Sequence, residues 1–170
     1  MRGVCTRTAH PEFLNRMQAI LNAAGLHVHI ENPYKLKTKG EMLIECGDQD
    51  FLKEEASRST SCGRFQRFNY RHCGRCVPCQ VRRAAFLAWG QQDTTDYVYE
   101  PLGKNDADHA GFDDVRSAAM AIAEVKAQGL DAWLGSALSM PQIGDVPRLR
   151  ALIARGLDEV AALHAAYGVK

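Results

Sequence analysis

Residues 61–79 read SCGRFQRFNYRHCGRCVPC, and this stretch decides how the rest of the chain is interpreted. It holds four of the chain's six cysteines in the spacing Cys-x10-Cys-x2-Cys-x2-Cys: Cys62, Cys73, Cys76 and Cys79. Four thiolates can surround one tetrahedral ion, which is the ligand set of a closed structural zinc site. Gly74 lets the backbone come close to the sulfurs. The pattern therefore predicts one structural Zn²⁺ bound by these cysteines.

Other uses of the cysteines stay open at this point. An iron–sulfur cluster also uses Cys-x2-Cys-x2-Cys, free cysteines are often buried, and disulfides form in oxidising compartments. The first residues, with Arg7, His10 and Glu12, lack the apolar run of a secretion signal. No stretch approaches the ~20 apolar residues of a membrane span. We therefore expect a reducing, cytoplasmic location, which favours a metal site over disulfides.

Composition indicates a globular chain whose charge is unevenly distributed. The 170 residues are 46% hydrophobic and 24% charged, with a net charge of +1, values typical of one folded domain with room for a helical tail. Seven arginines and no acidic residue lie between positions 58 and 83. Phe65, Phe68 and Tyr70 lie among them, so phosphate contacts and base stacking are conceivable there. A zinc-containing module that binds nucleic acid or a partner protein is therefore the alternative function.

Periodicity predicts a mostly helical chain with short strands. Apolar residues at three- and four-residue steps predict helices over residues 11–25, 77–90, 115–129 and 145–163, with a short one over 132–138. A capping box of Thr38 and Glu41 begins another helix, and Asp48 caps a short one. Alternation over residues 26–30 predicts a strand, with a second short strand at 97–99. The predicted class is α/β, predominantly helical.

The residues around the cysteines resemble the C-terminal half of 7-cyano-7-deazaguanine synthases. The shared pattern is Ser61-Cys62, then HCGRCVPC at residues 72–79 and the arginines at 82–83. Three flanking stretches resemble the branch of this family found in bacterial anti-phage cassettes: RTAHP at 7–11, NPY at 32–34 and TKGEML at 38–43. The resemblance covers roughly residues 5–100 and implies that the cysteine loop binds zinc.

The resemblance implies ATP-dependent chemistry on an ATP-pyrophosphatase domain, related to adenine-nucleotide hydrolases. Members of the family activate a deazapurine carboxylate by adenylation, let ammonia displace AMP, and dehydrate the resulting amide with a second ATP. Their phosphate site is an N-terminal Ser-Gly-Gly-x-Asp-Ser loop, which binds phosphate through backbone N–H groups. That loop does not occur in residues 1–170. We therefore expect ATP use only with a nucleotide-binding half from another segment or an adjacent gene product.

This expectation divides the chain into two parts. Residues 1–100 are predicted to form the C-terminal half of the synthase-like domain, including a zinc loop over 58–83. Residues 101–170 are predicted to form a helical extension. The expected partners are the nucleotide-binding half and other proteins of a defence cassette, with no membrane.

Four further residues are predicted ligand contacts. Lys39 matches a Lys-x-Glu helix start in related enzymes and is predicted to contact the phosphate of ATP, although a solvated surface lysine is the alternative. Arg7, Thr8 and His10 precede the first helix, in the region that borders the deazapurine pocket of the family. An ordinary loop before a helix is the alternative for these three, and no catalytic residue is assigned.

The two arginines that follow the cysteine motif receive a structural prediction. Arg82 and Arg83 lie in the helix predicted over residues 77–90, three and four positions after Cys79. They are predicted to hold carbonyl groups or thiolates of the cysteine loop.

Overall fold

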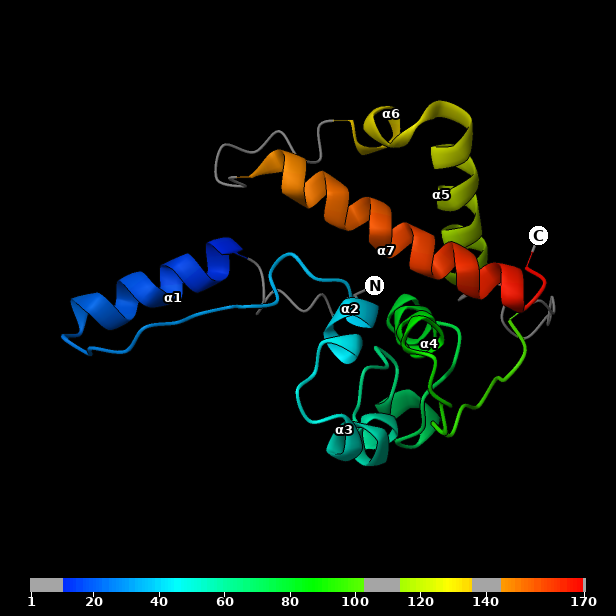
Figure 1. The fold of residues 1–170 in the computed structure, drawn as a ribbon, viewed down its shortest axis with the longest axis horizontal. Coiled ribbons are helices and arrows are strands. Elements are labelled where there is room, and N and C mark those ends of the chain that lie inside the picture. Colours follow the sequence, from blue (N-terminus) through cyan, green and yellow to red (C-terminus); the bar gives the residue numbers. More distant parts are fainter. Residues whose placement is uncertain (1–10, 103–113, 136–144, 170) are drawn as a thin grey trace.

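The structure is a computed structural model that describes residues 11–102, 114–135 and 145–169. The described parts are mainly helical (Figure 1). The helices are α1 (Pro11–Ala23), α2 (Lys39–Ile44), α3 (Gln49–Glu55), α4 (Val77–Trp89), α5 (Asp114–Gln128), α6 (Leu130–Leu134) and α7 (Val146–Ala166), with 3-10 turns η2 (Ala56–Arg58) and η3 (Gln66–Phe68). Within these ranges, none of the helices combines the length and the hydropathy that crossing a membrane requires.

Helix α4 is the centre of the molecule. It packs against α2, α5 and α7, and α7 runs across it in Figure 1. Its side chains enter three buried clusters: Cys79 joins the other cysteines, Ala84 joins the tail helices, and Phe86 with Trp89 packs beneath α2 and α3. A helix covered on several sides is a core helix. The metal loop is therefore attached to the best-buried element of the fold.

The predicted helix ends agree with the structure. Thr38 accepts from the Glu41 N–H at 3.1 Å, and the Glu41 carboxylate accepts from the Thr38 N–H at 2.8 Å, which confirms the capping box. Asp48 caps α3 and Asp145 caps α7 through their carboxylates. Gly90 ends α4 in the left-handed conformation, with φ of 72°.

The strand predicted over residues 26–30 is wrong. The segment is extended, but it pairs with no strand in the described residues. Gln18 of α1 instead donates to the Val28 carbonyl and accepts from the Ile30 N–H, both at 2.8 Å. A side-chain amide therefore satisfies the backbone groups that a neighbouring strand would have bound. The described part of the chain is helical rather than α/β.

The second predicted strand is reduced to a single bridge. His72 and Tyr97 form one isolated parallel bridge, and the Val98 N–H donates to the His72 carbonyl at 2.9 Å.

The short helix predicted at 132–138 corresponds to α6. The last three residues of that prediction lie outside the described ranges.

Candidate metal centre

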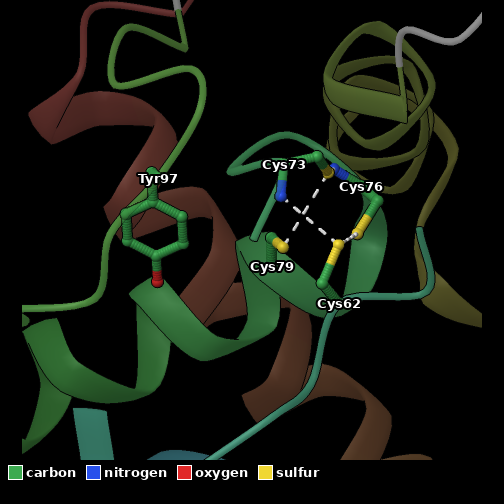
Figure 2. Close-up of a cluster of buried hydrophobic side chains, with 5 residues drawn as sticks. All are labelled: Cys62, Cys73, Cys76, Cys79 and Tyr97. Atoms are coloured by element: carbon green, nitrogen blue, oxygen red, sulfur yellow. Dashed lines mark hydrogen bonds between the residues drawn. The ribbon is translucent and has the colours of Figure 1, made fainter. Parts of the chain in front are cut away.

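The four cysteines of the motif lie together and could hold one metal ion. Their sulfurs all lie within 4.8 Å of one another, and all four residues are buried. Figure 2 shows the four sulfurs facing a common centre. The Cys62–Cys76 and Cys73–Cys79 sulfur pairs are each separated by 3.9 Å. Sulfurs bonded to one tetrahedral Zn²⁺ at about 2.3 Å lie about 3.8 Å apart, so this donor set fits a single ion.

Two different parts of the chain supply the four ligands. Cys62 and Cys73 come from the loop before α4, Cys76 is the N-cap of α4, and Cys79 lies in its first turn. Two residues separate Cys73 from Cys76, and two separate Cys76 from Cys79, so these three sulfurs lie at the start of one helix. The ten residues between Cys62 and Cys73 let the chain turn back, and Cys62 supplies the fourth sulfur. An ion at this centre would join the loop to the central helix.

Backbone N–H groups point at two of the sulfurs. The sulfur of Cys62 accepts from the N–H groups of Arg64 and Cys73, and that of Cys73 accepts from Cys76, each at 3.3 Å. Such donors stabilise thiolates. Hydrogen bonds from the other cysteines, first from Cys73, hold the pKa of Cys62 well below its ordinary value.

The thiols of Cys76 and Cys79 oppose full ionisation before a metal binds, because the pKa of each is raised. The pKa of Cys79 lies well above its ordinary value because of hydrogen bonding to Cys62 first, then to the other two cysteines, and because of burial. Loading a divalent ion must therefore release protons, and acid must weaken its binding.

Aromatic residues pack against the cysteine cluster. Tyr97 is buried beside the four cysteines, and Phe65 and Phe68 pack against them. His72 is also buried, and its Nε2 accepts from the Ser61 N–H at 3.3 Å. Burial, followed by the charge of Arg82, lowers the pKa of His72. His72 is therefore a neutral structural residue of the loop.

The two arginines hold carbonyl groups that flank the cysteine loop, whereas the prediction placed these groups within the loop. Arg82 donates to the Ala56 carbonyl and to the hydroxyls of Ser59 and Thr95. Arg83 donates to the carbonyls of Tyr99 and Glu100 at 3.1 and 2.7 Å. These contacts tie both flanks of the cysteine loop to α4.

Sequence reasoning missed the role of Asp114 at the start of α5. Its carboxylate accepts from the Val77 N–H at 3.2 Å and pairs with the Arg64 guanidinium at 3.2 and 3.3 Å. One tail residue thus caps α4 and also holds the cysteine loop. Nothing local in the sequence indicates this, because an aspartate before a helical pattern reads as the cap of its own helix.

The start of α2, where Lys39 lies, is bound by the tail. Glu159 of α7 accepts from the Thr38 hydroxyl and from the Gly40 N–H. Arg155, one turn earlier, pairs with Glu41 and donates to the Leu36 carbonyl at 2.9 Å. Lys39 itself is exposed, with its Nζ 3.7 Å from the Met42 sulfur. The contact of Lys39 with a phosphate stays a prediction. The Glu159 carboxylate binds the two residues that flank Lys39 in the sequence.

We expect Glu159→Ala to lower the free energy of unfolding by about 1–3 kcal/mol, because Thr38 and Gly40 lose an ionised acceptor. Urea unfolding followed by circular dichroism would measure the change. Asp158→Ala is the matched control, since Asp158 is the exposed neighbour on the same helix. Equal stability of the two variants would contradict the role assigned to Glu159.

Arg7, Thr8 and His10, the predicted substrate contacts, lie outside the described residues.

The alternative of a nucleic-acid-binding module depends on the arginines of residues 58–83, and most of these bind other residues of the protein or are buried. Arg71 pairs with both carboxylate oxygens of Asp96 at 2.6 Å. Arg64 pairs with Asp114 as described above, and three further arginines are buried: Arg75, Arg82 and Arg83.

Comparison with known proteins points to one family. Residues 8–90 match the family model of the queuosine biosynthesis protein QueC. The 7-cyano-7-deazaguanine synthase of Methanococcus aeolicus is 35% identical over 94 residues, which are 51% of this chain and 38% of the relative. That of Methanocaldococcus jannaschii is 34% identical over 91 residues, which are 51% of this chain and 39% of the relative. The chain thus spans less than half the length of these relatives. No solved structure matches it.

Proposed function

We propose that this chain is the zinc-containing C-terminal part of a 7-cyano-7-deazaguanine synthase-like ligase, which works with a nucleotide-binding part supplied by another segment. The observation that carries the proposal is that the buried four-cysteine cluster lies within the residues similar to QueC. Together the two parts would form an ATP-pyrophosphatase domain. That domain would adenylate a deazapurine carboxylate, exchange AMP for ammonia, and dehydrate the amide with a second ATP.

In this proposal the metal is Zn²⁺ and its role is structural. Four thiolate ligands leave no open coordination position for a substrate or a water molecule. The single small centre of sulfurs suits one ion better than a cluster of several irons. Bound zinc would supply a cross-link between the cysteine loop and α4, and the protein's own residues would bind and orient the substrates.

Lys39, exposed at the start of α2, and three residues that precede α1 in the sequence are proposed to complete the substrate site. Lys39 would contact a phosphate of ATP, while Arg7, Thr8 and His10 would border the deazapurine. The capping box and Glu159 hold the backbone on both sides of Lys39, so its position is fixed although its side chain is exposed.

Reconstitution tests the proposal. The purified chain is mixed with the part of the Methanococcus aeolicus synthase that lies outside the matched residues, together with ATP, ammonium and the deazapurine carboxylate. We expect AMP, pyrophosphate and the nitrile product only when both parts are present. Lys39→Ala should lower AMP release about tenfold or more, because it removes a charged phosphate contact. Its zinc content should not change.

Lys35→Ala is the matched control, because Lys35 is an exposed lysine of the same segment and should leave AMP release near the wild-type level. Absence of AMP from a mixture of two folded parts, with zinc bound, would overturn the proposal. Salt-dependent binding of RNA or DNA by the chain would then favour the alternative of a nucleic-acid-binding module.

We further propose that the chain acts within an anti-phage cassette. The support is the set of three sequence stretches at 7–11, 32–34 and 38–43 that resemble this branch of the family. Loss of protection against phage in cells whose chain carries Cys73→Ser would test this role.

A further inference from the structure

The helical tail, which contains α5, α6 and α7, reaches the cysteine loop at two points. The tail lies outside residues 8–90, which match the QueC family model. Helices α5 and α7 pack on α4 (Figure 1), and two of the four metal ligands lie at the start of α4. The synthase-like reaction proposed above gives the tail no role.

The first point of contact is Asp114, at the start of α5. Its carboxylate accepts from the Val77 N–H at 3.2 Å and pairs with the Arg64 guanidinium at 3.2 and 3.3 Å. Val77 directly follows Cys76, and the Arg64 N–H donates to the Cys62 sulfur at 3.3 Å. One carboxylate of the tail therefore holds residues beside two ligands that are separated by 14 positions.

The second point of contact is His164, near the end of α7. Its Nε2 lies 2.8 Å from the Gln80 Oε1, and the Gln80 Nε2 donates to the Arg75 carbonyl at 2.8 Å. Because a carbonyl only accepts, the Gln80 amide must present its nitrogen to Arg75 and its oxygen to His164, so His164 donates. His164 and Gln80 are 5% and 1% exposed. A buried chain of hydrogen bonds thus joins the tail to the turn between Cys73 and Cys76.

Both contacts require the cysteine loop to be closed. The loop contains one 3-10 turn and one isolated bridge, so its order depends on the metal and on side-chain contacts. Arg64, Arg75 and Val77 are within reach of their partners only when the loop is folded around the four sulfurs. Contacts that form only in the closed loop favour metal binding, and metal binding favours these contacts by the same factor.

We propose that docking of the tail and binding of zinc are coupled, so that Asp114 and His164 set the metal affinity of the cysteine loop. Neither residue belongs to the set of four ligands. Both are positioning residues that act through the backbone on either side of Cys76. The proposal rests on the metal assignment made above and does not depend on the synthase activity.

Competition between the full-length chain and a zinc chelator tests the proposal. Asp114→Ala should weaken zinc binding about tenfold, because two donors lose an ionised acceptor. Asp114→Asn keeps an acceptor for the Val77 N–H but no charge, so its zinc affinity should lie between those of the wild type and Asp114→Ala. His164→Phe keeps a ring but cannot donate to Gln80, and it should also weaken zinc binding about tenfold.

Asp145→Ala is the matched control, because Asp145 is also a capping aspartate of the tail but accepts from the Arg148 N–H at the far end of α7. Its zinc affinity should stay within about twofold of the wild type. The visible spectrum of bound Co²⁺ should be the same in all variants, since the four sulfur ligands are unchanged.

Three results would overturn the proposal. The first is an unchanged zinc affinity in folded Asp114→Ala and His164→Phe. The second is an equal loss of affinity in Asp145→Ala, which would assign the effect to general stability of the tail. The third is an altered Co²⁺ spectrum, which would show that a ligand itself had moved away. A wild-type chain that binds no zinc would instead refute the metal assignment, and this proposal with it.

Discussion

Replacing Cys73 by Ser is expected to release the metal and to unfold the cysteine loop together with α4. Structural zinc binding is worth on the order of 10–16 kcal/mol in small peptides, whereas whole domains are stable by about 5–15 kcal/mol. The loop has little other regular structure, since between Ser59 and Cys76 the structure contains the 3-10 turn η3 and the single bridge of His72 to Tyr97. Because α4 belongs to all three buried clusters, its loss should reach α2 and α7.

Metal analysis and circular dichroism measure this effect. The wild type should contain one zinc per chain, and a chelator should reproduce the Cys73→Ser spectrum. Cys46→Ser is the control, because Cys46 is half-buried outside the cluster, with its sulfur 3.7 Å from the Asp48 carbonyl. Iron with inorganic sulfide, or reduced and folded protein without metal, would contradict the zinc assignment.

Local signals in the sequence were sufficient for the helices and the cysteine cluster. The Thr38–Glu41 box, the Asp48 and Asp145 caps and Gly90 each act within one turn, so short stretches contain all the required information. The cysteine spacing is equally local, because three of the ligands lie within seven residues. These features therefore appear in the structure where the sequence placed them.

Features that depend on distant partners were not predictable. The alternation over residues 26–30 satisfies the pattern of a strand, but a strand also needs a neighbour, and Gln18 takes that place. The contacts of Asp114 with Val77 and of Glu159 with Thr38 join residues separated by 37 and 121 positions. A single sequence contains no signal for such pairs. The division of the chain at residue 100 stays a prediction.

The second large effect concerns Gly74, between two of the metal ligands. Its φ is +84°, which L side chains rarely adopt, and a Cβ built there would overlap the Tyr99 carbonyl oxygen. That carbonyl accepts from Arg83, and the Tyr99 N–H donates to the Cys73 carbonyl at 3.2 Å. A methyl group at this position would therefore push the 97–100 segment away from the loop and disturb the partners of a buried guanidinium.

Gly74→Ala is expected to lower the free energy of unfolding of the zinc-loaded chain by about 3 kcal/mol, from left-handed strain and steric overlap together. Gly90→Ala separates the two causes, because Gly90 has a φ of +72° but nothing within 4 Å of its added Cβ. It should cost only about 1 kcal/mol. Chemical unfolding of both variants, with zinc affinity measured by competition with a chelator, would compare them. Only Gly74→Ala should also weaken zinc binding, since it alone displaces the segment that packs on the cysteines. Equal losses of stability with unchanged zinc affinity would show that backbone conformation alone explains this glycine and that the Tyr99 segment does not support the metal site.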